Sequence, residues 1–252
     1  PREGGFLFRT YVDLGEVPAD DNHAIRKTPL ETIIAKANDI MHPYRMDVKE
    51  VAWWSVYEVG HRVTDRFDDV APDAPEGTDP RVFIMGDACH THSAKAGQGM
   101  NVSMQDAFNL GWKLAQVLRG RSSASLLRTY TGERQKIAQD LIDFDLEWSG
   151  RMAGNGDEEQ IEDFYVRTAE FPAGFMTQYP PSRVIAADAQ QGLASGYPLG
   201  KRFRSARALR RCDANDLHIG HLHEADGRWR VYVFADTAHP IDPASKARAF
   251  AA

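Results

Sequence analysis

The stretch 81–101 constrains the fold of this chain more than any other, because it joins an apolar run to a long helical pattern through a glycine-containing loop. The run Arg81–Met85 is too short for a helix and alternates too little for a half-exposed strand, so we predict a buried strand. Gly86 lets the chain leave the sheet without a side chain in the way. Asp87 then follows the strand, where open α/β sheets place their ligands, and its carboxylate can accept hydrogen bonds from polyol hydroxyls.

Two glycines precede the helix that we predict from Met100 to near Gly120. Gly97 and Gly99 leave little steric bulk there, so a flat or anionic group can approach the backbone. The first amides of a helix have no partner within it, and the helix dipole places partial positive charge at that end. Negative charge arriving at Gly99, Met100 and Asn101 would be stabilised. Gly-x-Gly turns and Asp caps are common, so these pieces alone do not identify a ligand.

Composition sets the outer limits. With 252 residues, 42% of them apolar, the chain can bury a sizeable core and hold one large domain or parts of several. The net charge of -6 argues against a general nucleic-acid binder or a protein of anionic membranes. No apolar run has the roughly 18 to 20 residues that span a bilayer. Cys89 and Cys212 form no disulfide framework, which is typical of a reducing cytoplasm.

Upstream of the central stretch, the pattern predicts strands around one helix. Residues 5–14 and 46–63 are rich in aromatic and β-branched side chains and are predicted as strands. Between them, a helix is expected to start with Thr28 as its N-cap and to stop before Pro43. Residues 67–80 contain many Asp, Pro and Gly residues and are predicted to form a solvated loop.

Downstream, helical spacing predicts two long helices, each with a buried stripe. The stripe of the helix that starts near Met100 would comprise Met100, Met104, Ala107, Phe108, Gly111, Leu114, Ala115 and Leu118. The second helix, 123–148, would bury Leu127, Tyr130, Ile137, Ala138, Leu141 and Ile142. Arg134 falls on this second stripe and needs a partner if it is buried.

The last third of the chain is predicted to begin with an exposed turn at 149–160 and a helix at 158–170, followed by irregular structure up to Gly200. Strands are expected from Ala206 onward. Residues 218–235 read as a hairpin closed by Ala225-Asp226-Gly227.

The string from Gly86 to Leu114, GDACHTHSAKAGQGMNVSMQDAFNLGWKL, closely resembles the second flavin-contacting motif of single-component FAD-dependent aromatic hydroxylases. It looks most like the phenol 2-monooxygenase and 3-hydroxybenzoate 4-monooxygenase branch. The resemblance extends to Trp53–Arg62, similar to the end of the substrate-binding sheet domain, and to Gly227–Phe234, similar to the start of a thioredoxin-like domain.

The resemblance implies an α/β fold in four parts. Residues 1–66 would be the end of the substrate-binding β-sheet domain, and 67–150 the C-terminal part of a Rossmann-like FAD-binding domain. Residues 151–200 would form a helical connector, and 201–252 the start of the thioredoxin-like domain. The thioredoxin-like part has no Cys-x-x-Cys, which argues against a redox role for it.

The same resemblance implies FAD as cofactor, NADPH and O2 as co-substrates, a phenolic substrate and a homodimer. Asp87 would hydrogen-bond the ribityl chain of FAD. The backbone at Gly97, Gly99, Met100 and Asn101 would face the pyrimidine edge of the flavin, where reduced flavin carries negative charge.

Three residues upstream complete the implied site. Tyr57 matches the tyrosine that meets the substrate hydroxyl in this branch, with a packed sheet tyrosine as the alternative. Lys49 would supply positive charge toward a phenolate or carboxylate, or else be solvated. Arg62 would approach the flavin, or else form a surface ion pair.

The sequence departs from the family pattern in two respects. Ala94 stands where the family usually has Pro after Ser93, which gives the loop more freedom. Nothing in residues 1–252 matches the family's Gly-x-Gly-x-x-Gly helix or its Asp-Gly motif. We therefore expect an internal fragment that binds FAD weakly or not at all and is inactive on its own.

Two other function classes remain open on the residues. His90 and His92 form a His-x-His pair that suits a metal-dependent hydrolase, although a third ligand at sensible spacing is not evident. A Ser93, His90, Asp87 triad is disfavoured because the chain lacks a Gly-x-Ser-x-Gly elbow. A non-catalytic fragment that serves only assembly is the other alternative.

Overall fold

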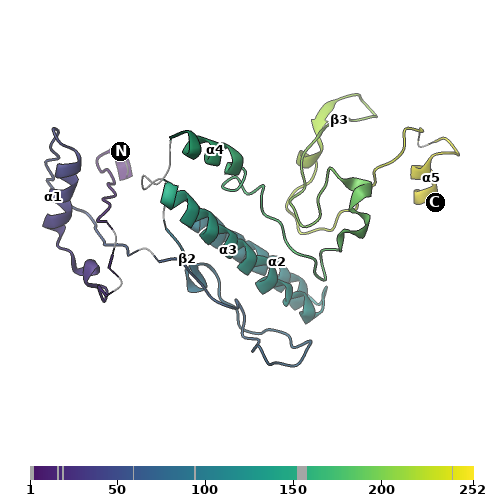
Figure 1. The fold of residues 1–252 in the computed structure, drawn as a ribbon. Helices are drawn as coiled ribbons and strands as arrows, with labels where there is room; N and C mark the ends of the chain where they lie inside the picture. Colours follow the sequence, from purple (N-terminus) through teal and green to yellow (C-terminus); the bar gives the residue numbers. More distant parts are fainter. Residues whose placement is uncertain are drawn as a thin grey trace.

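The computed structural model describes residues 3–15, 17–18, 20–58, 60–93, 95–151, 158–239 and 241–252, without the side chains of residues 3 and 158–160. Its fold is mixed α/β, with two long helices at its centre. These are α2 (Gly99–Leu118) and α3 (Thr129–Gly150), which run side by side (Figure 1). The N-terminal segment with α1 (Leu30–Ile40) lies to one side of this pair, and the C-terminal part of the chain lies to the other.

The core lies along the stripe of α3 that the sequence predicts. Tyr130, Ala138 and Leu141 are completely buried, and Leu127, Ile137 and Ile142 are buried as well. Phe67, Cys89 and Leu110 pack with Tyr130 and Ala138 in one cluster, and Val102 packs with Ile137 and Leu141 in another. The Tyr130 hydroxyl donates to the carbonyl of Ile84 at 2.9 Å. The predicted helix and its buried face are therefore confirmed.

The helix α2 is also confirmed, but its predicted buried face is wrong except for residues such as Leu114, which packs against the core cluster. Met100, Phe108 and Leu118 are 71%, 68% and 83% exposed, and the face toward the core instead carries Val102, Asp106, Asn109, Leu110 and Lys113. The reason is electrostatic. The facing side of α3 carries Glu133 and Arg134, both buried, and the polar residues of α2 turn toward them.

Most of the predicted strands in the N-terminal half are wrong. Residues 5–14 carry no named strand, and within 46–63 the described strand is β1 (Arg62–Val63). Residues 81–85 are not a strand either, although Phe83 forms an isolated antiparallel bridge with Asp68. A β-rich composition forms a strand only where a neighbouring strand supplies hydrogen bonds. Across the described residues, the ladders are β1 with β2 (His90–Thr91) and β3 (Arg207–Leu209) with β4 (Asp216–His218).

Helix boundaries agree better with the sequence. The helix α1 ends before Pro43 as predicted, but Pro29 and not Thr28 is its N-cap, since the Thr28 hydroxyl donates back to the Ile25 carbonyl. A short 3-10 turn, η4 (Ala124–Leu126), precedes α3. The helix α4 (Glu158–Thr168) matches the prediction. Of the turn predicted at 149–160, residues 149 and 150 belong to α3 instead, and residues 152–157 lie outside the described residues.

The C-terminal part begins its strands where predicted but does not contain the predicted hairpin. The strands β3 and β4 pair antiparallel, with Arg207 opposite His218. After β4 the chain forms the 3-10 turn η7 (Ile219–His221), and Trp229 and Val231 are 73% and 82% exposed. The chain ends in α5 (Lys246–Ala251), which the pattern did not predict. Within the described residues, no helix combines the length and the apolar character needed to cross a membrane.

The packing of α3 predicts a strong contrast between two leucines of that helix. Leu141 is completely buried, whereas Leu146 is 51% exposed. Leu141→Ala should lower the free energy of unfolding by about 2–5 kcal/mol, because it removes core contacts and leaves a cavity. Leu146→Ala should change it by no more than about 0.5 kcal/mol. Urea denaturation measures both, and equal losses for the two variants would contradict this description of the core.

Candidate functional site

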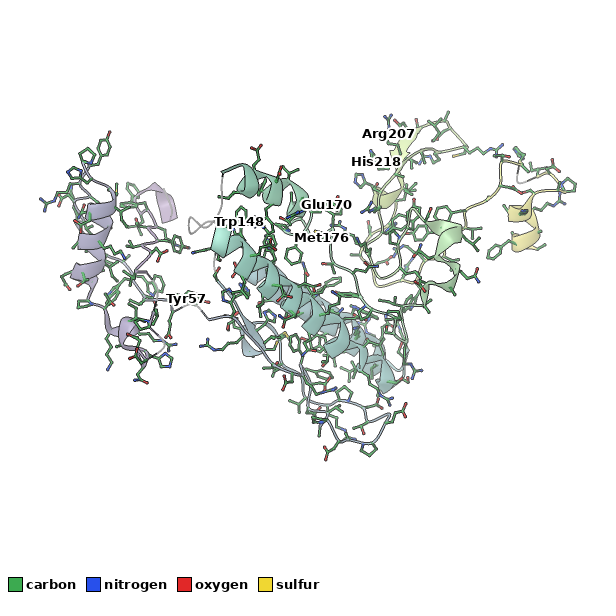
Figure 2. The ribbon with its side chains drawn as sticks, in the orientation of Figure 1. Tyr57, Trp148, Glu170, Met176, Arg207 and His218 are labelled. Atoms are coloured by element: carbon green, nitrogen blue, oxygen red, sulfur yellow. The ribbon has the colours of Figure 1, made fainter. Side chains whose placement is uncertain are left out.

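The strand pair β1–β2 brings residues that are distant in sequence to the loop that leads into α2. Arg62 pairs with Thr91, and the Thr91 hydroxyl donates to the Gly60 carbonyl at 2.7 Å. The Tyr57 hydroxyl donates to the His92 carbonyl at 3.2 Å. Figure 2 shows Tyr57 between the N-terminal segment and the α2–α3 pair. Two of the predicted site residues, Tyr57 and Arg62, therefore lie beside the segment 90–99.

The start of α2 is packed closely against that loop. A Cβ atom added to Gly99 would lie 2.5 Å from Cε1 of the His92 ring, so only glycine fits there without displacing the ring. The ring itself is buried, and its Nδ1 hydrogen-bonds the Ser93 carbonyl oxygen at 2.8 Å. Gly97 has a φ of +64°, which favours glycine, and a Cβ there would meet no atom within 4 Å. The backbone at Gly97 is therefore open, and that at Gly99 is fixed.

Asp87 lies in the short 3-10 turn η3 (Gly86–Ala88), which packs against α2. Gly86 has a φ of +60°, and a Cβ there would lie 3.1 Å from the Ser103 hydroxyl, in the second turn of α2. The Gly86 amide donates to Oδ2 of Asp106 at 3.1 Å. These contacts fix the backbone next to Asp87, whose own side chain is exposed. The turn thus presents a carboxylate to solvent beside the N-terminal half of α2.

A buried charge network holds η3, β2, α2 and α3 together. Asp106 accepts from Nε of Arg134 at 2.7 Å, and its other oxygen hydrogen-bonds Nε2 of His90 at 2.8 Å. The Arg134 guanidinium also donates to the Tyr179 hydroxyl at 2.8 Å and to the Val102 carbonyl at 3.3 Å. Asp106 and Arg134 are both completely buried. The partner that the buried Arg134 was expected to need is Asp106.

This network determines the charge state of its carboxylate. Burial raises the pKa of Asp106, but the hydrogen bond with His90 and the charge of Arg134 outweigh burial and hold that pKa below its ordinary value. Asp106 is therefore ionised at neutral pH, opposite a guanidinium that is always charged.

The structure gives no support to a metal site at His90 and His92. Their rings stack with centroids 6.3 Å apart, but His90 Nε2 faces Asp106 and His92 Nδ1 faces the Ser93 carbonyl. Cys89, His90 and Asp106 do lie close together. However, Asp106 is already bound by Arg134 and His90, and the Cys89 thiol donates to the Gly86 carbonyl at 3.3 Å. These three groups therefore already have partners within the protein.

The other predicted site residues, Met100, Asn101 and Lys49, make fewer contacts with the rest of the site. Met100 is 71% exposed, and the Asn101 side-chain amide donates to Gln98 Oε1 at 3.0 Å. Both belong to the first turn of α2. Lys49 is exposed in a segment without secondary structure and, among the described residues, forms no hydrogen bond or ion pair with the loop 90–99. Ala94, where the family usually has Pro, lies outside the described residues.

Asp145 is a residue of this region that the sequence reasoning missed. It lies on α3, is completely buried, and accepts from both the amide and the hydroxyl of Ser93 at 2.7 Å. Its carboxylate also hydrogen-bonds Nε2 of His61 at 2.8 Å. A signal was present in the sequence, because Asp145 follows Leu141 by four positions and so extends the apolar stripe with a carboxylate.

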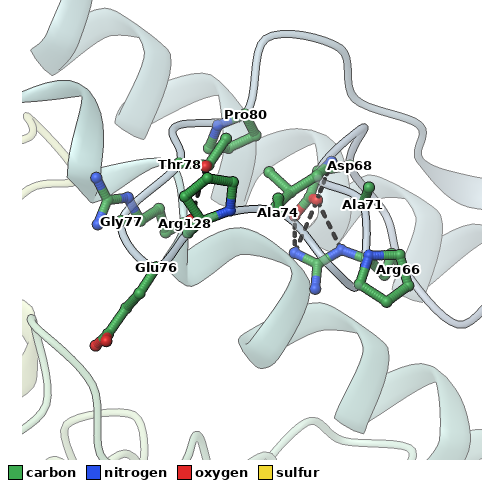
Figure 3. Close-up of a pocket in the computed structure, with 12 residues that line it drawn as sticks. Arg66, Asp68, Ala71, Ala74, Glu76, Gly77, Thr78, Pro80 and Arg128 are labelled. Carbon is green, nitrogen blue, oxygen red and sulfur yellow. Dashed lines mark hydrogen bonds and ion pairs between the residues drawn. The ribbon is translucent and has the colours of Figure 1, made fainter.

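A separate pocket lies on the surface of the molecule and is not this site (Figure 3). It is formed by the loop 70–80 together with Arg66, Asp68 and Arg128. Arg66 pairs with Asp68 at 2.9 Å and Arg128 with Asp79 at 2.7 Å, so both cations already have partners. Of the described residues that line the pocket, none is a predicted site residue.

Two family models match the chain. Residues 1–145 match an FAD binding domain, and residues 177–252 match the C-terminal dimerisation domain of phenol hydroxylase. The chain belongs to the family of FAD-dependent aromatic hydroxylases. The resemblance seen in Gly86–Leu114 is thereby confirmed, and so is FAD as the cofactor of the family. The finer division of the chain at residues 66, 150 and 200 stays a prediction.

Two monooxygenases with long sequence matches support the assignment. The chain is 50% identical to 3-hydroxybenzoate 4-monooxygenase of Comamonas testosteroni over 95% of its length and 40% of that protein. It is 40% identical to the FAD-dependent monooxygenase terD of Aspergillus terreus over 93% of its length and 38% of that protein. The chain therefore spans about two fifths of the length of these curated relatives.

A solved structure of the family has a similar fold. CabE, an aromatic hydroxylase from angucycline biosynthesis, is 26% identical, with a TM-score of 0.51. The match covers 76% of this chain and 36% of the CabE chain. It supports the mixed α/β fold.

The close packing at the start of α2 predicts opposite effects for two Gly→Ala changes in helices. Gly99→Ala should destabilise the protein by about 1–3 kcal/mol, because the new methyl group displaces the buried His92 ring. Gly132→Ala on α3 is the matched control. A Cβ there meets no atom within 4 Å, so the helix should gain up to about 1 kcal/mol. Urea denaturation compares the two, and a neutral Gly99→Ala would contradict the packing described.

The charge network predicts loss of stability in acid. Because the folded-state pKa of Asp106 lies below its ordinary value of 3.8, its stabilisation is complete above that pH and is lost as the pH falls through the folded-state pKa. We expect a carbon-13 NMR titration to give a carboxyl pKa below 3.8, with the Asp106→Asn variant identifying the resonance. A value above 3.8 would show that burial outweighs Arg134 and His90.

Proposed function

We propose that this chain forms part of an enzyme that uses FAD, NADPH and O2 to hydroxylate a phenolic aromatic compound. The observation that carries the proposal is the N-terminus of α2. The family motif assigns this region to the flavin. It contains the open backbone of Gly97, the closely packed Gly99 and the exposed carboxylate of Asp87. The two relatives described above are both named as monooxygenases.

The residues present fit a flavin at this position. A planar ring can approach Gly97 because no atom lies within 4 Å of where its side chain would be. The first amides of α2, at Gly99, Met100 and Asn101, have no partners within the helix and favour negative charge. Asp87 is free in solvent to accept hydroxyl donors of a ribityl chain. When bound, FAD supplies the transfer of electrons from NADPH to O2.

The chain's own residues would position the substrate and exclude water. Tyr57 would meet the substrate hydroxyl and help to ionise it. The hydrogen bond from Tyr57 to the His92 carbonyl supports this role, because it holds the Tyr57 side chain beside the loop that would face the flavin. Arg62 would add positive charge from β1. For Lys49 the support is weaker, since its side chain is exposed and lies in a segment without secondary structure.

A homodimer belongs to the same proposal. Residues 177–252 match a dimerisation domain, and this region exposes apolar side chains, including Leu209, Trp229, Val231 and Phe234. Such a surface is typical of a face that another polypeptide covers.

The test of function uses protein expressed from its complete coding sequence. We expect visible flavin absorbance, NADPH oxidation stimulated by phenol or a hydroxybenzoate, and a hydroxylated product. A colourless protein that contains zinc would favour the hydrolase alternative. A protein with neither would favour assembly alone.

The same assay tests the role of Asp87. Asp87→Ala should lower the flavin content of the purified protein, because the hydrogen bonds to the ribityl chain are lost. Asp73→Ala is the matched control, since Asp73 is also exposed but lies in the loop 70–80. Equal flavin content in wild type and both variants would remove the role assigned to Asp87.

A further inference from the structure

Asp145 gathers hydrogen bonds from two segments that are far apart in the sequence. One of its oxygens accepts from the Ser93 hydroxyl at 2.7 Å, and the other accepts from the Ser93 amide at 2.7 Å and bonds His61 Nε2 at 2.8 Å. The carboxylate is completely buried and Ser93 is 3% exposed. Ser93 belongs to the loop before α2, and His61 immediately precedes β1.

The chemistry of these contacts calls for a carboxylate. Burying a charge is costly unless hydrogen bonds replace its hydration, and three donors do so here. An amide of the same shape would accept less strongly than a carboxylate, and its NH2 end would force the Ser93 hydroxyl to turn and accept instead of donating. In the described part of the chain, no Lys or Arg forms an ion pair with Asp145, so its carboxylate is held by the directed hydrogen bonds from Ser93 and His61.

The loop that contains Ser93 connects Asp145 to the start of α2. The Ser93 carbonyl holds Nδ1 of His92, and the His92 ring packs on Gly99. The His92 carbonyl in turn accepts from the Tyr57 hydroxyl. On the other side of the loop, the Ser93 hydroxyl also accepts from the Lys95 amide at 3.1 Å. Asp145 is therefore connected through Ser93 to the helix terminus and to Tyr57.

We propose that Asp145 is a positioning residue, which clamps the flavin-facing loop at Ser93 and the β1 segment at His61 onto α3. It touches neither flavin nor substrate. It sets the distance between Tyr57 on one segment and the N-terminus of α2 on the other. The inference rests on the proposed function for its catalytic consequence, but the clamp itself is a property of the protein without cofactor.

Asp145→Asn in protein from the complete coding sequence tests the clamp, with Asp143→Asn as the control. Asp143 lies on the same helix, is exposed, and loses the same charge. Without cofactor, hydrogen exchange at the Ser93 amide should be faster in Asp145→Asn and unchanged in Asp143→Asn. With FAD, Asp145→Asn should shift the flavin absorbance spectrum and lower coupled product formation by up to about 100-fold, with more of the NADPH oxidised without product.

A second pair of variants keeps the proposal testable if Asp145→Asn does not fold. His61→Gln retains a donor near the position of Nε2 and should preserve coupling, whereas His61→Ala should not. A purely structural role would lower stability in both without this rescue.

Two failures can be told apart. Wild-type protein without flavin would overturn the proposed function and leave the exchange measurement as the test of the clamp. Unchanged exchange at Ser93 in Asp145→Asn, or equal coupling in His61→Gln and His61→Ala, would overturn the clamp itself.

Discussion

The ion pair between Arg134 and Asp106 is the interaction on which the rest of the structure depends. Both groups are completely buried, and together they bond the η3 turn, β2, α2, α3 and the segment that contains Tyr179. Breaking a buried pair by removing one partner leaves an uncompensated charge and typically costs about 3–5 kcal/mol. The geometry of this pair therefore constrains how η3 and β2 can lie against the two helices.

This constraint explains why α2 turns its polar face inward. Lys113 and Asn109 both donate to Oε2 of Glu133 at 2.7 Å. These contacts join α2 to α3, as the Asp106–Arg134 pair does. Burial lowers the pKa of the Lys113 ammonium, and the charge of Glu133 opposes that shift. Apolar periodicity in the sequence correctly located the helix but chose the wrong face. A pattern of apolar residues does not show which helix face meets a charged partner.

The sequence predicts local and self-contained features of this chain well. Helices α2, α3 and α4 satisfy their own backbone hydrogen bonds, so composition and spacing were enough to find them. The string Gly86–Leu114 indicated the family through its resemblance to a known motif, and the family models confirm it. Strands depend on a partner, and residues 5–14 or 228–235 carry strand-like composition without a neighbouring ladder in the described structure. The same dependence on distant partners hid Asp145, whose donors lie 52 and 84 positions away.

Two buried carboxylates fix the segment from Gly86 to Gly99 at several points along its length. Asp106 holds Gly86 and His90, and Asp145 holds Ser93. Packing of the His92 ring on Gly99 then connects Ser93 to the N-terminus of α2.

Asp87 and Gly97 lie between these fixed residues. The side chain of Asp87 is exposed, and the backbone of Gly97 is open. Such an arrangement is preorganised, since the groups that would meet a ligand need little reordering when it binds. The backbone of this segment is therefore held by two carboxylates that lie on the long helices, Asp106 on α2 and Asp145 on α3, and not by Asp87 or Gly97.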